Sequence, residues 1–278
     1  MPDTLILGVD FTSAPRPRKP ITIASGRLRA GRLHVAGVGA VAGFAGFDRL
    51  LASPGPWVGG FDFPFGLPRA LLERLGWPHQ PAEGESGWAR MVRHLEAMPR
   101  QQMVAAFRGW CDSRPPGAKF AHRATDLLAG SSPSMKWVNP PVAFMLQAGA
   151  PRLLAAGVRV PGLHAGDPRR VALEAYPGML ARAVLGRSSY KSDSRAGRTP
   201  ERSHARARLV AAMEAGTLLG LPVVLPSGLR AACVDDPQGD LLDAVLCALQ
   251  AAWAQQRRDS NFGLPADIDA VEGWIVGA

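Results

Sequence analysis

Four short acidic motifs interrupt otherwise apolar stretches of this 278-residue chain. They are Gly-Val-Asp10, Gly-Phe-Asp62, Leu-Glu174-Ala and the run from Asp240 to Asp243. Carboxylates are seldom fully buried unless they are paired or bind a metal, because burying one alone is costly or shifts its pKa until it is neutral. Several carboxylates brought together need a cation. The pattern therefore predicts a fold in which these acids meet around a divalent metal ion.

Three of the acids are preceded, on the same strand face, by a residue with little or no side chain. Residues i and i−2 of a strand share a face, and the pairs are Gly8 with Asp10, Gly60 with Asp62, and Ala172 with Glu174. Glycine weakens a strand interior and often marks a place where something else approaches closely. We predict that the space beside each acid is left for an ion or for a neighbouring carboxylate.

The last motif is predicted to open a buried helix. Asp240 and Asp243 are three residues apart, so they lie on one helix face. The rest of the segment is apolar almost all round, which is typical of a buried helix. The polar end of this helix should therefore point into the protein.

Three of the acids also have a structural explanation when each is taken alone, whereas Asp62 before Phe-Pro is the hardest to explain in this way. Asp240 in a first helical turn would favour the helix dipole, and Asp10 before Thr12 and Ser13 would suit a turn. Glu174 would pair readily with an arginine. Four such coincidences together are less expected than one, so the metal hypothesis stands beside these alternatives.

Length and composition limit the class of protein. With 278 residues, 47% of them hydrophobic, the chain is long enough for one large domain over 1–278. Its three cysteines show no Cys-x-x-Cys spacing, so neither a disulfide framework nor a zinc ribbon is indicated. We find no signal-peptide pattern and no run approaching the roughly 18 apolar residues of a membrane span. We therefore expect a cytoplasmic protein that does not enter membranes.

The charge of the chain is strongly basic. Its net charge is +9 and its pI about 10.4, and four of the 32 basic residues are lysines while the rest are arginines. Such a balance favours a polyanionic partner, above all nucleic acid. A chain rich in Ala, Arg, Gly and Pro is also typical of a genome-wide composition bias, which needs no such partner.

The densest basic stretch runs over 187–208. Four of its residues are candidate phosphate-binding groups, namely Lys191, Arg198, Arg202 and Arg206. Arg202 and Arg206 are four apart and share a helical face. A solvated helix and loop would explain the same residues.

Periodicity and turn residues predict an α/β chain. Buried strands are expected at 5–11, 57–68 and 169–178, with two more strands over 21–38 that turn at Gly26 and Gly31. Helices are expected at 43–53, 68–76, 179–186, 199–216 and 235–258. Thr199 and Asp236 are the expected N-caps of the last two, each followed by a proline.

Residues 78–165 differ from the rest because they carry many Pro and Gly and no repeated strand signal. We predict that they form a mostly helical insertion that caps the site. Within it, Arg123 and Asp126 are expected to form an ion pair.

In chain order, these motifs resemble the pattern of domain-of-unknown-function family 429. The resemblance rests on GVDFTSAP, GFDFPFGLP, the Arg123-x-x-Asp126 pair, EAYPG, the stretch from Lys191 to Arg198, and GDLLDAVLCALQAA, and it covers about residues 5–276. The order of the motifs carries it, since no single motif is specific.

The resemblance implies a ribonuclease H-like fold and a nuclease activity. That fold has a mixed five-stranded sheet flanked by helices, with the first three strands antiparallel and shorter parallel strands after them. Asp10 would end the first strand and Asp62 the fourth. Asp240 and Asp243 look like the late-helix pair of bacterial Holliday-junction resolvases, and Glu174 is an additional acid that the fold does not require.

Such a nuclease would use two Mg²⁺ or Mn²⁺ ions about 4 Å apart to activate water and stabilise the leaving oxygen. The carboxylates suit these hard ions. Asp10 is the expected bridging ligand, with Asp62 and Asp243 on either side of it. Asp240 or Glu174 would orient a water molecule.

Two other functions remain open from the sequence. One is a phosphotransferase or ATPase of the actin-like branch, because Asp10-Phe-Thr12-Ser13 is similar to the first phosphate loop of that branch, although EAYPG makes a poor second loop. The other is a binding module that kept the fold without turnover, since fold does not fix function. ATP binding measured by calorimetry would favour the first.

Overall fold

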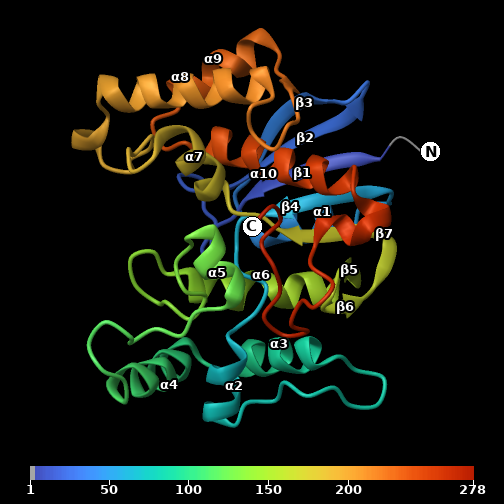
Figure 1. Cartoon of the computed structure of the whole chain (residues 1–278), viewed down its shortest axis with the longest axis vertical. Helices are drawn as coiled ribbons and strands as arrows, with labels where there is room; N and C mark the ends of the chain where they lie inside the picture. Colours follow the sequence, from blue (N-terminus) through green and yellow to red (C-terminus); the bar gives the residue numbers. More distant parts are fainter. Residues whose placement is uncertain (1–3) are drawn as a thin grey trace.

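An eight-stranded mixed sheet forms the centre of the protein (Figure 1). The structure is a computed structural model, and it describes residues 4–278. The sheet order is β6-β5-β7-β4-β1-β2-β3-β8. The strands are β1 Leu5–Asp10, β2 Ile21–Arg29, β3 Arg32–Val41, β4 Trp57–Phe61, β5 Val158–Val160, β6 His164–Ala165, β7 Asp167–Glu174 and β8 Val223–Val224.

Strand direction changes at β1. The first three strands form an antiparallel meander, whereas β4 and β7 run parallel to β1 on its other side. The expected mixed sheet flanked by helices is therefore confirmed, but its size is not: five strands were expected. The additional strands β5, β6 and β8 have only two or three residues each.

Helices cover both faces of the sheet. They are α1 Phe44–Leu51, α2 Arg69–Leu75, α3 Gly87–Ala97, α4 Arg100–Asp112, α5 Ala124–Ala129, α6 Val142–Ala155, α7 Pro177–Leu185, α8 Pro200–Ala215, α9 Ser227–Asp235 and α10 Asp240–Gln255, with short 3₁₀ turns at Arg195–Gly197 and Arg258–Gly263. In Figure 1, α2–α6 lie together below the sheet, while α7–α10 lie across and above it. The stretch 78–165 thus contains α3–α6, and it ends in β5 and β6 of the main sheet.

Side-chain alternation divides the interior into two cores. Ile6 of β1 and Val58 of β4 face the core that contains α7–α10. Leu7 is one residue after Ile6, and Phe61 is three residues after Val58. Both face the core that contains α3 and α6. Because successive strand residues point to opposite faces, every residue near the ends of β1 and β4 can be assigned to one core.

Cap residues set the limits of the two C-terminal helices. Thr199 accepts a hydrogen bond from the Arg202 amide, and Gly216 ends α8 in the left-handed conformation, as expected. Helix α10 begins at Asp240, later than expected, because Pro237, Gln238 and Gly239 form a loop. The expectation that Asp236 is its N-cap is therefore wrong, because Gly239 holds that position. The Oδ2 of Asp236 still accepts a hydrogen bond from the Leu241 amide at 3.0 Å. Among residues 4–278, no helix is long and apolar enough to cross a bilayer.

Candidate functional site

Asp10 and Asp62 end neighbouring parallel strands of the sheet. Gly8 pairs with Gly60 and Val9 with Phe61, and the Asp62 amide donates to the Val9 carbonyl at 2.9 Å. Since neighbouring strands lie about 4.8 Å apart, this register brings the two acids side by side. Both point to the α10 face, because each lies two residues after a glycine on that face.

The two glycines allow α10 to lie against the sheet. A Cβ atom on Gly8 would lie 2.7 Å from Ala248 Cα and still closer to the Ala244 carbonyl oxygen, and one on Gly60 would overlap the Cys247 carbonyl. The prediction that these glycines leave space for an ion is therefore wrong. The helix backbone fills that space, and its close approach brings the N-terminal end of α10 to the ends of β1 and β4.

Four carboxylates come together as a result. Burial raises the pKa of Asp10 well above its ordinary value, and Asp243, Asp62 and Asp240 raise it further. Burial also raises the pKa of Asp62 to about 7, with Lys191 acting in the opposite direction. Asp10, Asp62 and Asp240 line one cleft, and Asp243 lies on the same face of α10 as Asp240.

These acids differ in how their oxygens are satisfied. No described residue donates a hydrogen bond to the side-chain oxygens of Asp10, Asp62 or Asp240. Asp243 is fully buried, and both of its oxygens are used: Oδ1 accepts from the Tyr190 hydroxyl and Oδ2 from the Lys191 ammonium. Three of the carboxylates therefore lack a hydrogen-bond donor among the described residues, and the fourth has two.

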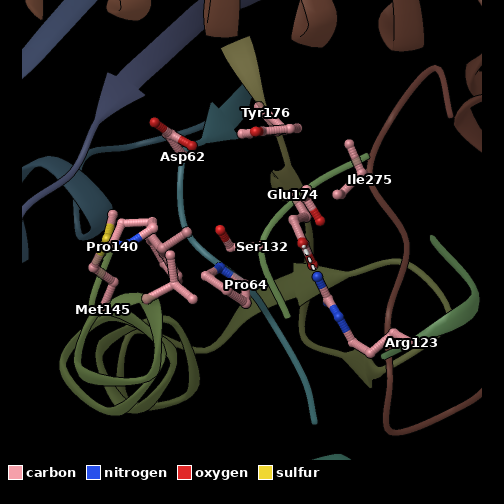
Figure 2. A pocket seen from close by; sticks show the side chains of 13 residues that line it. Asp62, Pro64, Arg123, Ser132, Pro140, Met145, Glu174, Tyr176 and Ile275 are labelled. Atoms are coloured by element: carbon pink, nitrogen blue, oxygen red, sulfur yellow. Dashed lines mark hydrogen bonds and ion pairs between the residues drawn. The ribbon is translucent and has the colours of Figure 1, made fainter. Parts of the chain in front are cut away.

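A cleft of about 520 Å³ opens over the cluster. Its lining includes Asp10, Asp62 and Asp240, and Pro140 just before α6. Thr12 and Ser13, which follow β1, also line it. A second pocket of about 70 Å³ adjoins it and shares Asp62. Figure 2 shows this pocket with Asp62 at one end and the Glu174–Arg123 pair at the other. The segment before α6 thus forms a wall of the candidate site.

Glu174 belongs to a different cluster. It pairs in register with Phe61, so it lies on the sheet face opposite to Asp62. Arg123 Nη2 donates to its Oε1 at 2.6 Å (Figure 2), and the Phe65 amide donates to its Oε2 at 2.9 Å. The catalytic assignment of Glu174 is therefore corrected to a structural ion pair, because both of its oxygens are occupied.

The expected Arg123–Asp126 ion pair is confirmed. Arg123 is 1% exposed, and its Nη2 donates to Asp126 Oδ1 at 2.8 Å. The same guanidinium thus holds Asp126 and Glu174 together, which joins α5 to the end of β7.

Of the four basic candidates, Lys191 reaches the acids. Arg206 does not, because it is 5% exposed and donates to the Val234 carbonyl at 2.7 Å and to the Tyr190 carbonyl at 2.8 Å. Its assignment as a phosphate-binding residue is corrected to a structural one. Arg202 donates to the Gly197 carbonyl at 2.5 Å, and Arg198 is exposed on the same loop.

The sequence reasoning missed Tyr190 and Tyr176. The hydroxyl of Tyr190 holds Asp243, and Tyr176 lines both the cleft and the smaller pocket. The signal was available, since these are the chain's two tyrosines and each lies in one of the motifs or directly beside one.

Carboxylate oxygens are the ligands that a hard divalent ion prefers, and those of Asp10, Asp62 and Asp240 have no hydrogen-bond donor among the described residues. As arranged, however, residues 4–278 contain no group of three or more His, Cys, Asp or Glu side chains spaced to hold a metal ion.

Fold and site define an α/β protein with carboxylates clustered at the carboxyl ends of two central parallel strands. The chain belongs to the family described as protein of unknown function DUF429, whose model matches residues 8–268. No curated protein and no solved structure matches it. The resemblance seen in the sequence is confirmed for the family, whose description names no activity.

Proposed function

We propose that this protein is a divalent-metal-dependent nuclease with a ribonuclease H-like sheet. The observation that carries the proposal is the cluster itself: Asp10 and Asp62 end adjacent parallel strands, accept no hydrogen bond from the described residues, and meet Asp240 and Asp243 at the start of α10. A cation is the simplest partner for such a group. The sheet order β3-β2-β1-β4-β7, antiparallel and then parallel, supports the fold assignment.

The residues that would hold Mg²⁺ or Mn²⁺ are Asp10, Asp62 and Asp243. When bound, the metal would activate water and stabilise the leaving oxygen of a phosphodiester. Asp240 lines the cleft, and burial raises its pKa to about 6, with Asp236 and Asp243 adding to that rise. We assign it to orient the attacking water.

Nucleic acid is the proposed substrate because the chain carries a net charge of +9 and the cleft is open to solvent. Lys19 and Lys191 line this cleft together with the hydroxyls of Thr12 and Ser13. These groups offer hydrogen bonds to phosphate oxygens without reading a base, so we expect contacts to the backbone of the substrate.

The test is cleavage of RNA, DNA, junction and hybrid substrates in Mn²⁺ by the wild type and by Asp10→Asn. We expect the variant to lose at least about 100-fold in rate, since even a residue that only supports a metal ligand costs up to about 100-fold. Glu214→Gln is the matched control, because Glu214 on α8 forms an exposed pair with Arg230 on α9. No cleavage of any substrate, or equal cleavage by wild type and Asp10→Asn, would contradict the proposal.

One observation favours a second candidate, an actin-like phosphotransferase. Thr12 and Ser13 line the same cleft as Tyr176, Pro177 and Gly178, so residues of two loops meet there as they would around a nucleotide phosphate. Calorimetric titration with Mg-ATP separates the candidates, since micromolar binding of ATP would favour this one.

A further inference from the structure

The ammonium of Lys191 lies among the carboxylates of the acidic cluster. Its ammonium donates to Asp243 Oδ2 and lies close enough to Asp62 and Asp10 to interact with both. It also lies 5.5 Å from the centre of the Tyr190 ring. One ammonium thus faces four carboxylates, and it leaves three of them without a hydrogen-bond donor among the described residues.

The chain on both sides of Lys191 is held in place. Arg206 donates to the Tyr190 carbonyl, and the Ser192 amide donates to the Pro237 carbonyl at 2.9 Å. The stem of Lys191 also packs against Gly239, where a Cβ would lie 3.0 Å from Lys191 Cβ. The backbone of this loop is therefore fixed to α8 and to the start of α10.

The end of the side chain has room to move. The side chain of Lys191 is 44% exposed and lines the open cleft, whereas Asp243, its partner, is fully buried. A lysine carries its charge on a flexible stem. The ammonium can thus leave Asp243 for the cleft without a change in the backbone.

We propose that Lys191 is the resident counter-ion of the acidic cluster and gives up Asp243 Oδ2 when a divalent ion binds. This inference rests on the metal site of the proposed function. Tyr190 and Lys191 occupy both oxygens of Asp243, so neither oxygen is free for a metal ion. An incoming dication also repels the Lys191 ammonium. Once released into the cleft, Lys191 is available to a phosphate oxygen, so metal loading and substrate binding are linked.

Titration calorimetry with MnCl₂ on the full chain tests this exchange. We expect Lys191→Met to bind Mn²⁺ at least about tenfold more tightly than the wild type, since removing a nearby like charge strengthens the attraction in a partly buried site. Lys19→Met is the matched control, because Lys19 lines the same cleft but pairs with Asp193 at 3.7 Å. Its affinity should stay within about threefold of wild type, as for an exposed pair.

Lys191→Arg is the second variant, because it keeps the charge and packs a similar stem. It should not bind Mn²⁺ more tightly than the wild type. Unchanged or weaker Mn²⁺ affinity in Lys191→Met would overturn the exchange. If the wild type and all variants fail to bind Mn²⁺, the exchange and the metal site are overturned together.

Acetylation of the wild type gives a readout that needs no variant, since the chain has four lysines. We expect Lys191 to be acetylated slowly in EDTA and several-fold faster in saturating Mg²⁺, while Lys119 and Lys136 keep their rates. Equal rates at Lys191 in both conditions would overturn the exchange. If both methods show the exchange but the protein cleaves no nucleic acid, the nuclease proposal is overturned and the exchange stands.

Discussion

A single methyl group at position 8 is expected to destabilise the protein by about 3 kcal/mol, the upper end of the usual cost of overpacking. The Cβ of Gly8→Ala would overlap backbone atoms of Ala244 and Ala248, which cannot rotate away as a side chain can. Helix α10 would have to move off β1, and Asp243 with it. Urea denaturation followed by circular dichroism measures the loss of stability.

The matched control is Gly39→Ala in β3, where an added Cβ meets no atom within 4 Å. It should leave stability unchanged or raise it by less than about 1 kcal/mol, because alanine reduces the freedom of the unfolded chain. Equal stability of the two variants would mean that α10 does not rest on β1 as closely as described.

The second large effect is expected at Arg123. Arg123→Met removes the one guanidinium that holds both Asp126 and Glu174, all three of which are buried. Breaking a buried pair on one side typically costs about 3–5 kcal/mol, since the remaining charge stays uncompensated. Thermal unfolding of the purified variant measures this loss.

The loss at Arg123 should also depend on pH. Burial raises the pKa of Glu174, and Arg123 acts against that rise. Without Arg123 the folded-state pKa climbs further, so the variant is most stable where Glu174 is protonated and loses stability as the pH rises. Arg230→Met, which breaks an exposed pair with Glu214, should cost about 1 kcal/mol or less at any pH. A small, pH-independent effect at Arg123 would contradict the buried network.

Many of the strands and helices could be predicted from the sequence, because the signals that define them are local. β1 is a short apolar run, and α8 lies between Thr199 and Gly216, whose capping preferences are strong. The meeting of Asp10 and Asp62 followed from one repeated pattern, an acid at the end of a buried strand. The family resemblance added the order of the strands.

The errors share a different cause, since each concerns which neighbour a residue meets. Val171, Leu173, Ala172 and Glu174 are all buried, so no polar side marks the face to which Glu174 points. Gly8 shows that something comes close without showing that it is a helix. Arg206 lies in a helix with arginines and alanines around it, and the sequence does not distinguish the buried arginine from the exposed ones.

Anomalous diffraction from crystals soaked in MnCl₂ tests the central claim, that the four acids form a divalent cation site, most directly. The expected result is an anomalous peak between the carboxylates of Asp10 and Asp62, with Asp243 turned toward it and Lys191 released. A map without a peak at this place, with Asp243 still bound by Tyr190 and Lys191 in saturating Mn²⁺, would contradict it.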